Sequence, residues 1–219
     1  MDLEKFQKDV NQVTNKLSQK LSAEDLPKIN YVRNQLIEMY KKNLVKINHS
    51  VLELICAADL IANGYSVEVE KQVSEILVCD LFARKGYGDT IIEIETGFTP
   101  PDHALDTIDY STARIMSKIA RYSKYCSKFS LATPVTGLIP IPKIFLLPPK
   151  YRKKEDVQKV QVLCDRYYKN PSVTYDDILN ARLHSIYLIN VDKNFAKSLD
   201  PQGYVELTEK LLSRSEVQY

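Results

Sequence analysis

Two strongly β-forming runs in this chain carry acidic residues among apolar ones. The first run covers residues 74–82 and contains Asp80, and the second covers residues 90–96 and contains Glu93 and Glu95. Apolar, β-branched strands are normally half or fully buried, and a carboxylate inside one is costly unless it is paired or bound to a metal. We therefore expect a fold built on a sheet whose strands hold these acids where their charge is compensated.

The spacing of the acids in the second run has two interpretations. Because side chains alternate along a strand, Glu93 and Glu95 project from the same face, about 6 to 7 Å apart. Carboxylate oxygens gathered in this way on adjacent strands suit a hard divalent cation such as Mg²⁺. Alternatively, both residues line the wet face of an edge or antiparallel strand.

Hydrophobic periodicity predicts the order helix, strand, strand, strand, helix, strand for residues 47–133. Hairpins followed by a helical crossover give a mixed sheet with helices on its faces, so we expect the α/β class. The expected elements are a helix at 51–62, strands at 65–70, 74–82 and 90–96, a helix at 105–126, strands at 129–133 and 143–147, a helix at 153–169, a strand at 184–191 and a helix at 201–219.

The first 46 residues are predicted to form two helices joined near residues 20–22. Apolar residues recur there at the three- and four-residue spacing of a helical hairpin or coiled coil. Such a hairpin packs on the rest of the chain, mediates oligomerisation or clamps a substrate. We divide the chain into an N-terminal helical appendage at 1–46, an α/β core at 47–195 and a helical tail at 196–219.

Charge is strongly segregated along the chain. Residues 47–112 carry twelve Asp or Glu against three Lys or Arg, whereas residues 113–169 carry thirteen Lys or Arg against three acids. This segregation is typical of a metal-dependent enzyme acting on a polyanion, with carboxylates for the metal and cations for phosphates. A surface generally rich in Lys and Glu explains a high charge content, but it explains the segregation less well.

Several classes of protein are disfavoured by composition. No apolar run approaches the roughly 18 to 20 residues that a membrane span needs, and the charged N-terminus is unlike a signal peptide. The four cysteines are widely separated and form no CxxC pair, which favours buried free thiols over a zinc ribbon or a disulfide framework. We expect a soluble, cytoplasmic protein with no membrane partner.

The predicted element order, with an acid in the second strand and an acidic pair in the third, resembles the PD-(D/E)xK nuclease superfamily. The resemblance covers roughly residues 47–147, and it implies a restriction-endonuclease-like αβββαβ core, a mixed central sheet flanked by helices, here preceded by the N-terminal helical hairpin. Asp80 takes the place of the family's metal-binding Asp, and Glu93 takes that of the acid that opens the third-strand motif. Glu53 matches an acid that many members carry on the first helix.

One position departs from the family pattern. Glu95 falls where the family usually has Lys, so the motif here is ExE in place of ExK. In some relatives the basic residue lies on the neighbouring helix, and Arg114, Lys118 and Arg121 are spaced to share one helical face. The site is therefore either an acidic variant or degenerate.

The resemblance implies metal-assisted hydrolysis of a phosphodiester. Asp80, Glu93 and the backbone carbonyl of Ile94 would hold Mg²⁺ or Mn²⁺, with Glu53 as a further ligand, and Glu95 would bind a second metal or position a water. The residues assigned to catalysis are Asp80, Glu93, Glu95, Lys118 and Arg121.

A basic run at residues 150–154, interleaved with tyrosine, is the densest positive stretch. Basic side chains contact phosphates while aromatic rings stack on bases, although a solvated helix start gives the same composition. The predicted nucleic-acid contacts are Arg114, Lys124, Lys150, Arg152, Lys153 and Lys154. The histidines have no metal-ligand spacing between them, and we interpret them as structural or surface residues: His49, His103 and His184.

The leading hypothesis is a metal-dependent nuclease acting on DNA in repair, recombination or defence, with RNA not excluded and a homodimer possible. One alternative is a catalytically inactive relative that binds DNA or serves as a subunit. A second alternative is an interaction module whose helical hairpin is the working part.

Overall fold

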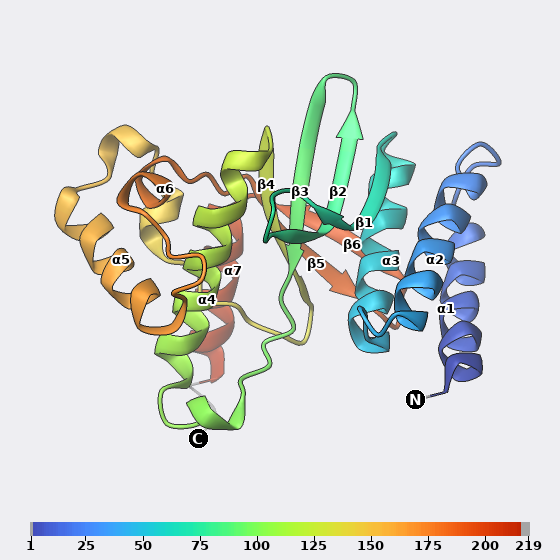
Figure 1. The fold of residues 1–219 in the computed structure, drawn as a ribbon, viewed down its shortest axis with the longest axis horizontal. Coiled ribbons are helices and arrows are strands. Elements are labelled where there is room, and N and C mark those ends of the chain that lie inside the picture. The colour runs from blue at the N-terminus through green and yellow to red at the C-terminus, as the bar shows by residue number, and fades with distance from the viewer. Residues whose placement is uncertain (1, 216–219) are drawn as a thin grey trace.

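A six-stranded sheet separates two groups of helices in the computed structural model, which describes residues 2–215 (Figure 1). The helices are α1 Leu3–Ser18, α2 Leu26–Lys41, α3 Ile47–Ala62, α4 Thr107–Tyr122, α5 Lys154–Tyr167, α6 Tyr175–Asn180 and α7 Pro201–Ser215. The strands are β1 Ser66–Gln72, β2 Val78–Lys85, β3 Gly88–Ile94, β4 Lys128–Pro134, β5 Ser185–Asn190 and β6 Phe195–Leu199. Short 3-10 turns are η1 Pro101–His103, η2 Ser123–Tyr125, η3 Lys143–Leu146 and η4 Pro149–Tyr151.

The sheet is mixed, and its strands follow one another in the order β1-β2-β3-β4-β5-β6. The β1/β2, β2/β3 and β5/β6 pairs are antiparallel, whereas β3/β4 and β4/β5 are parallel. A parallel pair needs a crossover, and α4 provides it between β3 and β4. The predicted α/β class and the predicted element order for residues 47–133 are confirmed.

Each face of the sheet is covered by its own hydrophobic cluster. Alternate residues of β2 and β3, such as Leu81 and Ile92, pack with α1, α2 and α3 on one face. Their neighbours Phe82 and Ile91 pack with α4, α5 and α7 on the other face. Because both faces are buried, these strands are almost continuously apolar, and a charged side chain within them stands out.

The β2–β3 connection is tighter than the predicted loop at 84–89. Both strands continue to a two-residue turn, in which Gly86 has φ +59° and Tyr87 is fully exposed. A left-handed residue matches the twist of a hairpin turn, and glycine adopts it without steric cost. The hairpin fixes the register between Asp80 and Glu93.

The N-terminal helices pack within the chain. Phe6 and Val10 of α1 and Ile29 and Leu36 of α2 are fully buried in the cluster that also contains α3 and one face of the sheet. Burial of each such side chain contributes about 1.5–3 kcal/mol to folding. Of the three uses considered for the hairpin, intramolecular packing is therefore realised in this structure.

Residues 143–147 do not form the predicted strand. They form η3 instead, in which the Phe145 N–H donates to the carbonyl of Pro142 at 3.0 Å and the Leu147 N–H donates to Ile144 at 3.3 Å. A short apolar run has no periodicity that distinguishes a strand from a buried turn, and here the proline before it favours the turn.

Two further elements, α6 and β6, were not predicted. Strand β6, Phe195–Leu199, crosses the predicted boundary between the core and the helical tail at residues 195 and 196, and it pairs with β5. The C-terminal helix is confirmed for Pro201–Ser215, and the remainder of that prediction, residues 216–219, lies outside the described residues. Among residues 2–215, no helix is both long and apolar enough to cross a membrane.

Candidate metal and catalytic site

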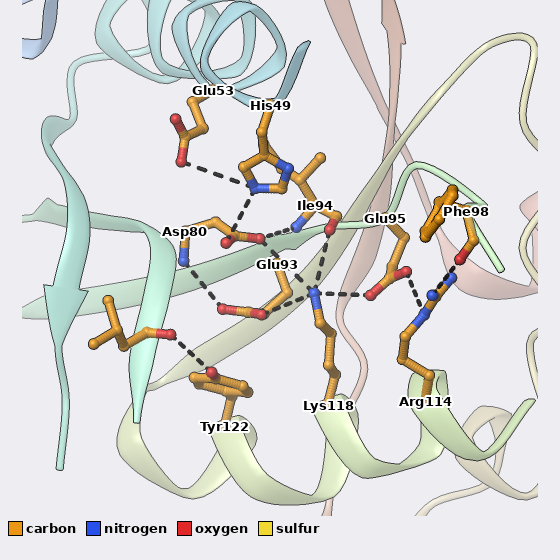
Figure 2. A network of polar contacts seen from close by, with 11 residues as sticks. His49, Glu53, Asp80, Glu93, Ile94, Glu95, Phe98, Arg114, Lys118 and Tyr122 are labelled. Carbon is orange, nitrogen blue, oxygen red and sulfur yellow. Dashed lines mark hydrogen bonds and ion pairs between the residues drawn. The ribbon is translucent and has the colours of Figure 1, made fainter. Parts of the chain in front are cut away.

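The acids of the two central strands meet where the backbone ladder between β2 and β3 ends. Leu81 and Ile92 form the last backbone pair. Beyond them, the Asp80 N–H donates to Glu93 Oε1 at 3.1 Å, and the Ile94 N–H donates to Asp80 Oδ2 at 2.5 Å (Figure 2). Each carboxylate thus replaces a missing carbonyl partner, and this exchange holds both acids in a defined position as the strands diverge.

Lys118 of α4 brings a positive charge to these acids. Its ammonium nitrogen lies 2.8 Å from Glu95 Oε1, 3.1 Å from Glu93 Oε2 and 3.9 Å from Asp80 Oδ2. The same ammonium donates to the carbonyl of Ile94 at 3.2 Å. Three carboxylates and one carbonyl therefore converge on a single cation (Figure 2).

The packing of α4 explains why Lys118 reaches the site. Ile115 and Ile119, which flank it along the helix, are buried against the sheet. The hydroxyl of Tyr122 donates to the carbonyl of Val78 at 2.7 Å and ties the helix to β2. Lys118 is one turn before Tyr122, so its side chain is directed toward the same strands.

The Asp80 and Glu93 carboxylates both approach the Lys118 ammonium, which limits how far apart they lie. Oxygens that lie 3.9 and 3.1 Å from one nitrogen are separated by at most the sum of these distances, about 7 Å. This bound lies below the roughly 8 Å beyond which one cation could not bridge the two acids, and two ligands of one Mg²⁺ or Ca²⁺ ion at 2.0–2.6 Å lie within about 5 Å of each other. The bound is therefore compatible with one shared ion when the two oxygens lie at the shorter end of the range.

Glu93 and Glu95 point to the same face, as their spacing predicted, and that face is not wet. Glu93 is 2% exposed and Glu95 is 3% exposed. Glu95 is held between two cations, since its second oxygen lies 2.9 Å from Arg114 Nε. The interpretation of these acids as surface decoration is therefore wrong.

A second group of ligands lies on the α3 side of Asp80. His49 and Glu53 occupy positions i and i+4 of α3, and Glu70 comes from β1. One ligand atom from each of these residues and from Asp80 lies within 4.8 Å of the others. His49 Nε2 is 3.2 Å from Asp80 Oδ1 and 3.9 Å from Glu53 Oε1.

Glu70 reaches this group through a local distortion of β1. The pairs Val69–Leu81 and Lys71–Cys79 flank it, so that Glu70 stands opposite Asp80. Its φ is +48°, a left-handed conformation that a residue with a Cβ rarely adopts. Such strain is found mainly at sites where it serves a function, because it costs about 1–3 kcal/mol.

Glu53 is the most deeply buried acid of the site, with no exposed surface. No N–H or hydroxyl group of the described residues donates a hydrogen bond to either carboxylate oxygen. The hydrogen-bonding neighbour of Glu53 is another carboxyl, that of Glu70. Burial raises the pKa of Glu53 well above its usual range, and the charges of Asp80 and Glu70 raise it further. A buried acid surrounded by other acids is the arrangement that a bound cation would stabilise.

The two strand acids are driven apart in acidity. Burial, followed by the charge of Asp80, raises the pKa of Glu93 to about 8. Burial alone would raise the pKa of Asp80 too, but the charge of Lys118 and the hydrogen bond from His49 outweigh it and lower that pKa. Glu93 therefore keeps its proton to a higher pH than Asp80 does.

The donor set fits a divalent cation. It offers carboxylate oxygens from Glu53, Glu70 and Asp80 together with one imidazole, that of His49. Hard oxygen ligands suit Mg²⁺ and Mn²⁺, and the imidazole shifts the preference toward the transition metal. The earlier interpretation of His49 as a structural or surface residue is corrected, because α3 brings it to the acids despite the absence of another histidine nearby in sequence.

Arg121 is not part of the site. Its guanidinium donates to the carbonyls of Tyr168 and Pro171, in the segment that follows α5. Among the three basic residues that helical spacing placed on one face, Lys118 contacts the strand acids and Arg114 contacts Glu95. The prediction of Arg121 as a catalytic residue is therefore corrected.

The prediction of Arg152 as a nucleic-acid contact is also corrected, because its side chain has a structural role. It is 8% exposed, and its guanidinium donates to backbone carbonyls at 2.7 to 3.1 Å. These carbonyls belong to residues that precede Arg152 or to the end of α6: Ile144, Leu147, Ile178 and Leu179.

We expect Arg152→Ala to lower the free energy of unfolding by about 3 kcal/mol or more, because it leaves several buried carbonyls without a donor. The matched control is Lys150→Ala, an exposed position two residues away, which should change it by less than about 0.5 kcal/mol. Urea denaturation measures both. Equal, small effects would show that Arg152 does not hold this segment together.

The other predicted contacts lie outside the carboxylate cluster. Lys124 pairs with Asp177 at 3.0 Å. Lys150, Lys153 and Lys154 are exposed around the start of α5. Their role in binding nucleic acid stays a prediction.

Comparison of the chain with protein-family models, with curated proteins and with solved structures finds no match in any of the three. Any function assigned to the site must therefore come from its own geometry and chemistry.

Proposed function

We propose that this protein is a metal-dependent nuclease that hydrolyses phosphodiester bonds of DNA, built on a restriction-endonuclease-like core. The observation that carries the proposal is the convergence of Asp80, Glu93, Glu95 and the Ile94 carbonyl on the ammonium of Lys118. Acids paired on two strands beside a cationic amine can together serve a metal and a phosphate.

Lys118 can replace the lysine that the family pattern has at the position of Glu95. Glu95 stands where the resemblance expects a lysine, but Lys118 reaches Glu93 and the Ile94 carbonyl from α4. Three carboxylates outweigh the effect of burial and raise the pKa of Lys118 well above its usual range, so it stays cationic at any working pH. This arrangement supports an active variant in preference to a degenerate one.

The chain's own residues would divide the work as follows. Asp80, Glu93 and the Ile94 carbonyl would hold Mg²⁺ or Mn²⁺, and His49, Glu53 and Glu70 would complete a cation site on the other side of Asp80. The bound metal would act as a Lewis acid on the phosphate and lower the pKa of a water. Lys118 would orient that water and stabilise the negative charge that develops on the phosphate. Arg114 would hold Glu95 in position against Lys118.

A second candidate is an inactive relative that uses this fold to bind DNA or to serve as a subunit. It is favoured by the ion pairs of Lys118 and Arg114, which neutralise part of the acidic charge without any metal. Under this alternative the cluster is a buried salt-bridge network and has no chemistry.

A cleavage assay separates the two candidates. Purified protein with labelled single- and double-stranded DNA is expected to cut in the presence of Mg²⁺ or Mn²⁺ and to stop when EDTA is added. Salt-sensitive DNA binding without cleavage would favour the inactive relative. If the protein neither binds nor cleaves DNA, the nuclease and the inactive DNA-binding relative are both contradicted.

Metal binding can be tested without activity. We expect Mn²⁺ at saturating concentration to raise the midpoint of thermal unfolding by about 5 °C or more relative to EDTA. Glu70→Gln should reduce this increase, whereas Glu68→Gln, on the same strand and paired with Lys71, should not. An equal response of both variants would remove Glu70 from the metal site.

The effect of Mn²⁺ should also grow between pH 6 and pH 8. Burial raises the pKa of Glu53 and brings that of Glu93 to about 8, so the folded metal-free protein holds protons that a cation must displace. As pH rises these protons are lost, the acids become free to bind metal, and the thermal shift increases. Thermal unfolding at several pH values, with and without Mn²⁺, measures this trend. A shift that is constant or falls with pH would contradict the acids as ligands.

A further inference from the structure

A cavity of about 500 Å³ lies beside the carboxylate site. It is formed by the first two turns of α4, the segment at 138–143 and α7. Its volume falls within the range of about 300–1,000 Å³ that small-molecule sites occupy. The residues that shape it include Ile108, Ser111, Ile115, Ile139, Ile141 and Val205.

Arg114 connects the cavity to the site. It lines the cavity wall, its Nε contacts Glu95 at 2.9 Å, and its Nη1 donates to the carbonyl of Phe98 at 2.5 Å. Lys118 is the next residue on the same face of α4, four positions along, which corresponds to about 6 Å of helix rise. Arg114 in the cavity wall is therefore one helical turn away from Lys118, and Figure 2 shows both side chains rising from the same helix toward the acids.

The chemistry of the walls suits a flat, partly apolar ring with polar edges. Isoleucine side chains supply the apolar surface, and the hydroxyl of Ser111 can donate or accept a hydrogen bond. The hydroxyls of Thr107 and Thr208 donate to backbone carbonyls one turn earlier, so they offer acceptors to a ligand. Arg114, which pairs with Glu95, brings a guanidinium to the lining, and the exposed Lys143 lies 3.7 Å from Glu209 at the edge of the cavity. A neutral heterocycle attached to an anionic group matches this distribution of charge and apolar surface.

We propose that this cavity receives one unpaired nucleoside of the DNA strand, next to the phosphate that is cleaved. The proposal rests on the proposed function, because it places the nucleoside beside Lys118 and Arg114. A base in a duplex is stacked and paired, so it must be extruded before it can enter a concave pocket. The enzyme should therefore favour single strands and frayed ends over intact duplex.

The first test observes binding alone. Four isoleucines line the cavity, so protein labelled at isoleucine methyl groups is titrated with deoxyadenosine 5′-monophosphate in the presence of Ca²⁺. The methyl signals of Ile108, Ile115, Ile139 and Ile141 should shift, and Ile29, on the other face of the sheet, should not. Deoxyribose 5-phosphate, which lacks the base, should leave the cavity methyls unchanged. Equal shifts with both compounds, or no shift with the nucleotide, would overturn the proposal.

The second test uses a single-stranded oligonucleotide that contains 2-aminopurine, a base whose fluorescence rises when it is unstacked. Wild-type protein in Ca²⁺ should increase the emission several-fold. Ser111→Phe, which fills the cavity, and Ile108→Glu, at its exposed rim, should abolish the increase and weaken binding by about ten-fold. Val162→Glu replaces another exposed apolar residue, on α5, and is the control for the second variant.

The outcomes distinguish the cavity from the active site. Cleavage by wild type that shows no preference for single strands, and that is unaffected in Ile108→Glu, would overturn the cavity proposal and leave the nuclease proposal intact. Absence of any cleavage, with methyl shifts still present, would overturn the nuclease proposal on which this inference rests.

Discussion

Replacing Asp80 by asparagine is expected to reduce metal-dependent DNA cleavage by about 10³-fold or more while the fold is retained. Asp80 belongs to both ligand groups, since its carboxylate lies 3.2 Å from His49 and within 3.9 Å of Lys118. An amide keeps an oxygen that can accept the Ile94 N–H, but it lacks the charge that attracts a cation. Cleavage rates in Mg²⁺ and Mn²⁺, together with circular dichroism, measure the result.

Asp89→Asn is the matched control for this substitution. Asp89 lies on the same β2–β3 hairpin, and its carboxylate accepts the N–H and O–H of Ser127 at 2.6 and 2.9 Å, away from the carboxylate site. The two variants make the same chemical change in the same sheet, so only the site differs. Cleavage that survives Asp80→Asn at more than a tenth of the wild-type rate would contradict the assignment of Asp80 as a metal ligand.

The strand acids were predictable because their relation is local. Alternation along one strand puts Glu93 and Glu95 on the same face, and consecutive hairpin strands put Asp80 beside them. Their apolar neighbours favoured burial, although a wet face was the alternative, and the structure shows that Glu93 and Glu95 are buried. A pattern of this kind depends only on residues that are near one another in the chain, so it can be predicted from the sequence.

His49 and Glu70 were not predicted because their contribution depends on tertiary contacts. His49 is brought to Asp80 by the packing of α3 on the sheet, and the sequence places no second histidine near it. Glu70 faces His49, Glu53 and Asp80 because its φ in β1 is positive. Glycine is the residue that usually indicates a positive φ in a sequence, and this position has none. The spacing of His49 and Glu53 by four residues was the one local signal available.

Helical spacing identified three basic residues that could reach the strand acids, but it could not tell which of them do. Arg114, Lys118 and Arg121 share one face of α4, but only Arg114 and Lys118 contact the strand acids, whereas Arg121 contacts backbone carbonyls. Carbonyls at residues 168–171 hold Arg121, and these come from a segment almost fifty residues away in sequence. A pattern within one helix contains no information about such a partner.

Replacing Lys118 by methionine should lower cleavage by about 10²–10⁴-fold and should also destabilise the metal-free protein by about 3–5 kcal/mol at pH 8. Methionine is of similar length but leaves three carboxylates without their shared cation. Loss of the ammonium removes a charge that lowers the pKa of Asp80 and Glu93, so both pKa values rise in the folded state. The folded state then binds more protons than the unfolded state, and the free energy of unfolding falls as pH rises. The destabilisation should therefore be smaller at pH 5 than at pH 8, as urea denaturation at the two pH values would show.

Adding Mn²⁺ separates the structural role of Lys118 from its catalytic role. Lys124→Met, which removes an ion pair with Asp177 and a contact with the Tyr125 ring, is the control for stability and should change the free energy of unfolding little. A divalent cation compensates the acids as the ammonium does, so Mn²⁺ should restore much of the stability that Lys118→Met removes. If Lys118 acts on the water and the phosphate, cleavage must stay low in the restabilised variant, because no metal ligand replaces that function. Recovery of cleavage together with stability would mean that Lys118 only neutralises charge, and the chemistry would then belong to the metal and its carboxylates alone.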